Sequence, residues 1–293
     1  CWIDNPSTVF GDQKVAAGED VFNSGAFENA AARFKHLAER IASPHRVRFR
    51  ALLAELYHAW AGLDLEHLPE RIDDIKAMLR DHRVGLDHVR VDQLGHQLTF
   101  LHSLAHEERR DALLLCFYLL GKHYSALGRR DFAALLFYRT AEGVMTDHLE
   151  RSYDNFKSRP TNFEALNVDM DKLASDYRGN CEQIFPHSGA AELPGALGFM
   201  SSAVLLYCLP EDKLLREAHI RDVKALTRLH QLSEIRNRSI LAHGFQPVTA
   251  ERLRELENLA LRLLSALWRL HHPEDDLQAR IHQLTFIKLG EAD

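Results

Sequence analysis

The residue types best suited to chemistry lie together in one short stretch, EIRNRSILAHGFQPV, at positions 234–248. Arg236 and His243 are seven residues apart, which on a helix is about 20° short of two full turns, so they share one face. Ser239 lies on the same face, whereas Arg238 points roughly 140° away from His243. A guanidinium that binds phosphoryl oxygens, beside an imidazole that transfers protons, indicates chemistry on a phosphodiester.

His243 stands at the predicted end of that helix. Gly244 follows it, Pro247 comes three residues later, and Thr249 can cap the next helix. The carbonyl end of the helix dipole favours the protonated imidazole, which suits the histidine for proton transfer. Because seven residues place the Cα atoms of Arg236 and His243 roughly 10 Å apart along the axis, two symmetric copies would form a more compact site than one. This predicts an isologous homodimer.

The run RNRSILAHG, in which Asn237 follows Arg236 and His243 comes after six intervening residues, resembles the motif of HEPN ribonucleases. The preceding long helix, the ending AHGFQPV and the segment LLFYRTAEGVMTDHL resemble the helical part of CRISPR-associated proteins that pair a CARF sensor with a HEPN effector. An earlier segment, YHAWAGLDLEHLPERI, is similar to their helical linker, although AGLD departs from the expected Trp-Asp-x-Phe. The motif-specific resemblance covers about residues 226–264.

The resemblance implies metal-independent cleavage of single-stranded RNA in antiviral defence, without a cofactor. The 2′-hydroxyl of the substrate attacks the adjacent phosphate and leaves a 2′,3′-cyclic phosphate. His243 then handles the proton, Arg236 stabilises charge on the phosphorane, and Asn237 orients groups around it. The resemblance also implies activation by cyclic oligoadenylate through an upstream CARF domain, and nothing in these 293 residues looks like one.

Local charge supports an RNA site on the same helix. The chain carries a net charge of −6, which excludes a protein coated with basic surface, so any nucleic-acid site must be local. Residues 214–243 hold six basic and three acidic residues, and we assign Arg228, Arg238 and Ser239 as candidate substrate-binding residues. The alternative is a solvated helix face with ion pairs between successive turns. A histidine beside a C-terminal glycine can also simply cap the last carbonyls.

The elements that position these residues are helices. Apolar residues recur at helical spacing in six long segments, and the fold class is therefore all-α. These segments are 47–63, 68–80, 112–127, 131–154, 213–242 and 249–271. We expect a helical linker or bundle over 1–110 and a HEPN-like domain over 111–293, with an irregular, Pro- and Gly-rich insert at about 158–198. Only QLTFIKL, at 283–289, alternates like a short strand, and its assignment stays open.

Residues 18–39 and 121–142 resemble each other when the chain is shifted by 103 positions. Both predict a helix, a glycine turn at Gly25 or Gly128, and a second helix whose alanines allow a close crossing. These are tetratricopeptide-like hairpins, although two copies 103 residues apart do not make a solenoid. In the second hairpin Phe132, Phe137 and Tyr138 are expected in the core, and a supporting role of Arg139 or Glu142 near the active site is a minor alternative.

Other classes are less compatible with the sequence. His102 and His106 have the spacing of two helical metal ligands, but the acid of a zinc protease is absent, so no metal is expected. The chain has no apolar run of 18 residues, no leader-like start and four scattered cysteines, which indicate a cytoplasmic protein outside membranes. Because it opens at Cys1, we expect a longer protein upstream.

Two alternatives to a ribonuclease stay open at this point. The first is a helical, tetratricopeptide-like interaction module in which the motif is vestigial. The second is a HEPN protein that binds RNA or nucleotides without cleaving them.

Overall fold

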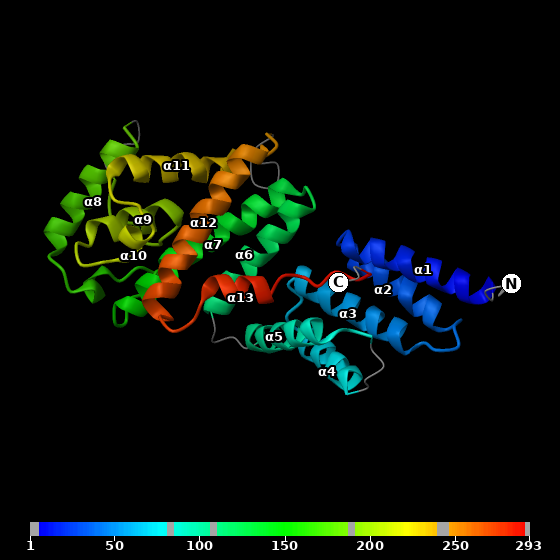
Figure 1. Ribbon diagram of the computed structural model, residues 1–293. Coiled ribbons are helices and arrows are strands. Elements are labelled where there is room, and N and C mark those ends of the chain that lie inside the picture. The colour runs from blue at the N-terminus through cyan, green and yellow to red at the C-terminus, as the bar shows by residue number, and fades with distance from the viewer. Residues whose placement is uncertain (1–5, 81–84, 106–109, 187–190, 239–245, 291–293) are drawn as a thin grey trace. The chain divides into compact units, whose positions relative to one another are not determined.

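The computed structural model describes residues 6–80, 85–105, 110–186, 191–238 and 246–290 (Figure 1). Within these ranges the chain forms thirteen α-helices and one short 3₁₀ helix, with no β-strand, which confirms the all-α fold class. It divides into two compact units, one of Cys1–Arg109 with Ala279–Asp293 and one of Arg110–Gln278. None of the helices in the described ranges has the length and apolar character needed to cross a membrane.

The first unit consists of five helices and the C-terminal segment. The helices are α1 (Pro6–Asn23), α2 (Phe27–Ala38), α3 (His45–Ala61), α4 (Leu68–Leu79) and α5 (His88–Leu104). Its core contains a cluster of aromatic rings, in which Tyr57 on α3 contacts Phe22, Trp60 and Phe286 with ring centroids 4.7–6.0 Å apart. Such offset and edge contacts are favoured between aromatic rings.

The C-terminal segment QLTFIKL is not a strand, which answers the question that its alternation left open. Its first residue, Gln283, ends α13, and the residues after it have no regular secondary structure. Side chains of the first unit bond their backbone in place of a partner strand. Ile287 N donates a hydrogen bond to the Tyr57 hydroxyl (3.1 Å), and Asn23 exchanges two hydrogen bonds with the backbone of Leu289 (2.8 and 2.9 Å). Ile287 and Leu289 are buried, so the apolar alternation reflects packing onto helices.

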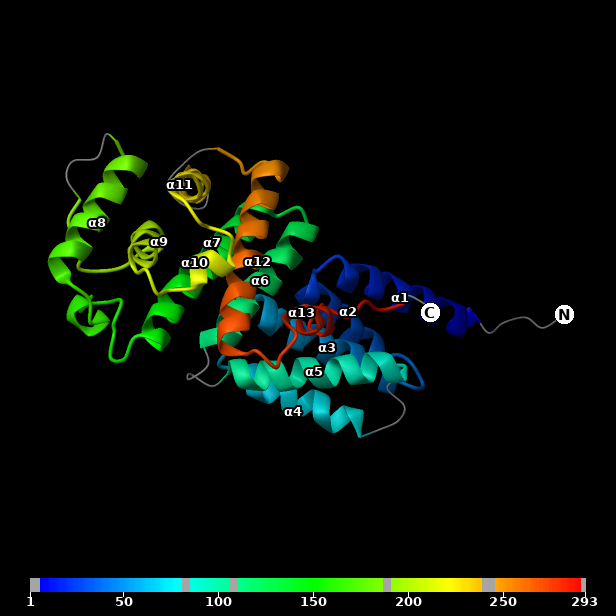
Figure 2. The ribbon, with the colours of Figure 1, turned by 60° about the vertical axis from the view of Figure 1, so that its left-hand side comes forward.

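The second unit contains the stretch singled out by the sequence (Figure 2). Its helices are α6 (Arg110–Ala126), α7 (Arg130–Ser152), η1 (Phe163–Leu166), α8 (Met170–Ile184), α9 (Phe199–Cys208), α10 (Leu214–Glu217), α11 (Val223–Arg238) and α12 (Ala250–His271), and α13 (Leu277–Gln283) begins at its end. α6 and α7 form an antiparallel hairpin against which α12 packs. α9 and α11 lie side by side next to α7, and both are viewed almost end-on in Figure 2.

Two helix predictions in this unit are wrong. The single helix expected over 213–242 is interrupted between α10 and α11, where His219 has a left-handed backbone (φ 59°) and the Asp222 carboxylate accepts a hydrogen bond from Ala225 N (2.8 Å). The insert expected to be irregular contains α8. Asp169 caps that helix, and its apolar residues, Leu173, Tyr177, Cys181 and Ile184, form one buried stripe.

The two hairpins related by the 103-residue shift are built alike. Gly25 and Gly128 end their first helices with positive φ (76° and 73°), as predicted. A Cβ placed on Gly18 would lie 2.5 Å from the Phe34 ring, and one on Gly121 would lie 2.6 Å from the Phe137 ring. The glycine in the first helix therefore lets the phenylalanine of the second helix pack directly onto backbone.

We expect Gly121→Ala to destabilise the second unit, because Phe137 is fully buried and cannot move away from an added methyl group. Overpacking of this kind costs about 1–3 kcal/mol. Gly179→Ala in α8 is the matched control, because nothing lies within 4 Å of its added Cβ and alanine is the better helix former by about 1 kcal/mol. Urea or thermal unfolding should show opposite shifts for the two variants. Equal shifts would contradict the close Gly121–Phe137 packing.

Candidate active site

Arg236 lies in the last turns of α11, where it continues the buried face of the helix. Leu226, Leu229 and Ser233 are buried, and their spacing of three and four residues leads directly to position 236. Arg236 is half-buried as a result. The residue assigned to phosphate chemistry therefore points toward the neighbouring helices rather than into open solvent.

An aromatic pair from two other helices receives the Arg236 side chain. Its guanidinium carbon lies 5.4 Å from the centroid of the Tyr138 ring on α7. The same ring stacks on Phe199 of α9, with centroids 4.8 Å apart and planes inclined by 19°. A cation over an aromatic face is attracted by about 0.5–2 kcal/mol, depending on its desolvation. The stack Arg236–Tyr138–Phe199 thus joins α11, α7 and α9.

The phenol of Tyr138 stays neutral in this environment. Burial raises the pKa of Tyr138 to about 12, and the nearby Glu142 raises it as well, while Arg236 and Arg139 lower it. Tyr138 therefore acts on Arg236 through its ring and not through a phenolate charge.

Arg139 and Glu142 form an ion pair on α7 next to this stack. Glu142 is one helical turn after Tyr138, and its carboxylate lies near Gly198, where α9 begins. The sequence placed these two residues near the active site only as a minor alternative. The structure brings them beside the partner of Arg236, and the i, i+4 spacing from Tyr138 was the available signal.

Arg228, assigned above to substrate binding, lies on the exposed side of α11 and pairs with Glu255 of α12 (2.6 Å). Arg252 also approaches that carboxylate (3.3 Å). The Arg228–Glu255 pair joins two helices, whereas the alternative reading of the charge pattern expected ion pairs between successive turns of one helix.

The other predicted residues are described only in part. Asn237 and Arg238 belong to the last turn of α11, but the structure does not describe their side chains. Ser239 and His243 lie outside the described residues. Beyond them Thr249 caps α12 as predicted, because its hydroxyl accepts a hydrogen bond from Arg252 N (3.3 Å). The catalytic set Arg236, Asn237 and His243 therefore stays a prediction.

The comparison with known families decides the classification. The family model described as the Csm6 HEPN domain matches residues 106–267, which is more than half of the chain and includes the whole of α11 and its motif. The chain belongs to this family. The resemblance to CRISPR-associated HEPN ribonucleases is thereby confirmed, and the family connects the chain with ribonuclease function in CRISPR defence. No curated protein matches the chain.

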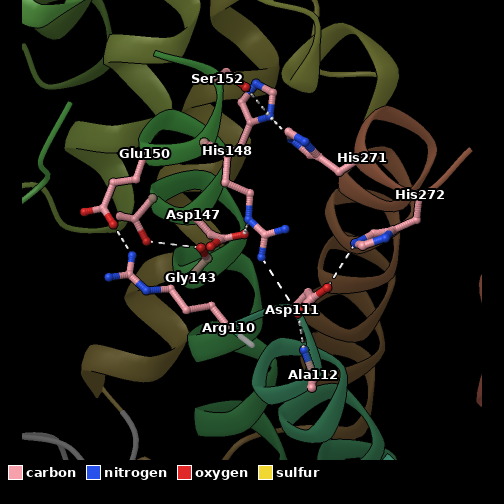
Figure 3. A network of polar contacts seen from close by, with 12 residues as sticks. Arg110, Asp111, Ala112, Gly143, Asp147, His148, Glu150, Ser152, His271 and His272 are labelled. Atoms are coloured by element: carbon pink, nitrogen blue, oxygen red, sulfur yellow. Dashed lines mark hydrogen bonds and ion pairs between the residues drawn. The ribbon is translucent and has the colours of Figure 1, made fainter. Parts of the chain in front are cut away.

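Most of a buried polar network that sequence reasoning missed lies within the matched region, and only His271 and His272 come after it (Figure 3). His148 on α7 contacts Asp212 through Nε2 (2.9 Å) and His271 at the end of α12 through Nδ1 (3.0 Å). The side chains of His148 and Asp212 are only 5% and 3% exposed. Tyr153 donates a hydrogen bond to the same Asp212 carboxylate (3.2 Å), whose other oxygen accepts one from Leu214 N (2.9 Å).

A second set of contacts continues this network toward α6. Arg151 pairs with Asp147 (2.7 Å) and approaches Asp111 (3.8 Å), which also contacts His272 (3.0 Å) (Figure 3). The ends of α6, α7 and α12 are thereby tied together. In the part of the chain that the structure describes, no three His, Cys, Asp or Glu side chains converge where a metal ion could bind.

We expect acid to destabilise the fold partly through His271. Burial, followed by the neighbouring His148, lowers the pKa of His271 to about 4, below the ordinary value of about 6.5 in an unfolded chain. Between these values the unfolded chain binds a proton that the folded chain does not. The contribution of His271 to stability is therefore complete above pH 6.5 and is lost as the pH falls toward 4.

Urea unfolding of the wild type and of His271→Gln at pH 7, 6 and 5 measures this contribution. The variant should lose less stability than the wild type on acidification, because glutamine does not titrate. His123, whose pKa burial also lowers to about 4, gives a second variant of the same kind, and His123→Gln should flatten the profile as well. Wild-type and His271→Gln profiles that run parallel would contradict the assignment.

Proposed function

We propose that this chain is a ribonuclease that cleaves single-stranded RNA in CRISPR-associated antiviral defence in the cytoplasm, by attack of the substrate's own 2′-hydroxyl. The new bond joins the 2′-oxygen to phosphorus, and the bond from phosphorus to the 5′-oxygen breaks. The products are a 2′,3′-cyclic phosphate and a 5′-hydroxyl. The observation that carries the proposal is the sequence set Arg236, Asn237 and His243, which begins in α11 and falls within the region that matches the Csm6 HEPN domain.

Each residue has a role that suits its chemistry. His243 handles the proton that moves from the 2′-hydroxyl to the leaving 5′-oxygen, and Asn237 orients groups around the phosphate. Arg236 stabilises the charge that develops on the phosphorane. Its contact with Tyr138 supports this role, because a cation fixed before the reaction needs no reorganisation when the charge appears.

The proposal includes a symmetric dimer and an upstream activator. A helix that ran through both Arg236 and His243 would place their Cα atoms about 10 Å apart along its axis, so a second copy related by a twofold axis would complete a compact site. Cyclic oligoadenylate bound by a preceding CARF domain would then regulate the pair of helices. Cleavage of the RNA needs no cofactor or metal in this mechanism.

Arg236→Ala and His243→Ala should each reduce cleavage by at least about 10²-fold with folding intact, because each removes a group that acts in the transition state. Arg236→Lys should also lose most of the activity, since an ammonium cannot form the bidentate contact. EDTA should have no effect, and mass spectrometry should find the cyclic phosphate. Cleavage that survives both alanine substitutions would overturn the proposal, and wild-type binding without cleavage would favour the non-cleaving alternative.

Substitution of Tyr138 tests how Arg236 is held. Tyr138→Phe should keep nearly full activity, because the ring and not the hydroxyl contacts the guanidinium. Tyr138→Leu should lower kcat about tenfold with little change in KM, as expected for about 1–2 kcal/mol of lost positioning. In an Arg236→Ala background Tyr138→Leu should have no further effect. A parallel loss in both backgrounds would mean that Tyr138 acts on the fold alone.

Sedimentation tests whether two subunits together form the active site. Active protein should sediment as a dimer at micromolar concentration, and mixing the inactive Arg236→Ala and His243→Ala proteins shows whether the two residues act across subunits. A monomer with full activity would contradict the dimer.

A further inference from the structure

A pocket of about 270 Å³ opens on the second unit, and Asp147 of the polar network is part of its lining. It lies between α6, α7 and the residues that follow α7. Its apolar lining comes from α6, and three arginines line it as well. The apolar residues are Leu113, Leu114 and Phe117, and the arginines are Arg110, Arg139 and Arg159.

The three arginines face solvent, and two of them pair with acidic side chains that are more deeply buried. Arg110 is 63% exposed and pairs with Glu150, which is 19% exposed. Arg139 is 53% exposed and pairs with Glu142, which is 12% exposed. Arg159 is held by two hydrogen bonds from its guanidinium to Leu197 O (3.2 and 3.3 Å). A ligand approaching the pocket of this acidic chain therefore meets guanidinium groups first, which suits a phosphate.

The apolar wall has room because position 143 is a glycine. A Cβ on Gly143 would collide with the Leu114 side chain, so any larger residue there would displace this wall. Phe117 is partly exposed in the same wall. An aromatic ring and two leucines next to exposed arginines provide the two components that bind single-stranded nucleic acid, a stacking surface and a positive rim.

The pocket also lies next to the residues that hold Arg236. Arg139 and Glu142 line it, and Tyr138, which carries the Arg236 guanidinium, precedes Arg139 directly and Glu142 by one helical turn of about 5.4 Å. A strand whose phosphate is at Arg236 would reach the pocket with a neighbouring nucleotide.

We propose that this pocket binds one nucleotide of the single-stranded RNA beside the cleaved bond. Its base lies against Phe117 and the two leucines, and its phosphate contacts Arg110 and Arg139. The proposal rests on the proposed ribonuclease function and adds the path of the substrate to it. Because the base must leave any stack to enter, the pocket also selects single strands over duplexes.

The test measures binding without cleavage. The probe is a fluorescent ten-nucleotide 2′-O-methyl RNA, which cannot be cut because it has no free 2′-hydroxyl. Arg110→Gln combined with Arg139→Gln should weaken binding at least tenfold at 100 mM salt, and the slope of log Kd against log salt should fall by roughly 0.7 for each lost phosphate contact. Arg178→Gln, an exposed arginine on α8 outside the pocket, is the control and should change Kd less than twofold.

Phe117 tests the stacking component. Phe117→Ala should weaken binding of the 2′-O-methyl RNA about tenfold but leave binding of an abasic strand of the same length unchanged. Phe117→Leu keeps the apolar wall, so its affinity for the 2′-O-methyl RNA should lie between those of the wild type and of Phe117→Ala. Thermal unfolding of each variant shows whether the fold is preserved.

The outcomes separate this proposal from the function on which it rests. Equal affinities of the Arg110/Arg139 double variant and the Arg178 control would overturn the pocket, even where Arg236→Ala abolishes cleavage. Weakened binding in a protein whose cleavage survives Arg236→Ala and His243→Ala would keep the pocket and overturn the ribonuclease mechanism. Competition by free AMP as strong as that of the strand would assign the pocket to a mononucleotide and overturn its role in RNA binding.

Discussion

The packing of α7 is the constraint on which the second unit depends. This helix contacts α6, α9, α11 and α12, and its packing against α6 and α12 is the most extensive between helices of the unit. Successive side chains on a helix are about 100° apart, so adjacent residues serve different neighbours. Phe137 packs onto Gly121 of α6, whereas Tyr138 faces Phe199 of α9 and Arg236 of α11. The close helix crossing and the placement of Arg236 are therefore set by two consecutive residues.

The other end of α7 is fixed by polar contacts of a different kind. His148 and Asp212 are almost fully buried, and withdrawing such groups from water offsets most of what their mutual contact contributes. The network instead fixes the positions of the helices relative to one another, because hydrogen bonds form only in a narrow range of geometries. They require Asp212 just before α10, His148 on α7 and His271 at the end of α12. Hydrophobic packing alone would tolerate a sliding of these helices that the network does not.

Much of this fold follows from the periodicity of the sequence, and the failures have physical causes. The glycine turns of the two hairpins and the Thr249 cap were predicted because each depends on a local backbone requirement. The interruption between α10 and α11 was missed because apolar spacing continues across it, although the backbone of His219 and the Asp222 cap mark it in the structure. α8 was hidden between proline- and glycine-rich segments. The C-terminal segment alternates like a strand, but its hydrogen-bond partners are side chains far away in the sequence, which no local pattern encodes.

The candidate site also contains residues that the sequence predicts and residues that only the structure reveals. Arg236 was found from its type and its distance to a histidine, but Tyr138 and Phe199 were not, because their contact with it depends on how three helices cross. The positions of charged side chains likewise cannot be derived from the net charge of the sequence. A net charge of −6 says nothing about where the arginines stand, and around the pocket on α7 the carboxylates are the more deeply buried partners of each pair. An acidic chain can thus present a positive surface to a phosphate, because it is the depth of each charge, and not the sum of charges, that determines what an approaching strand meets first.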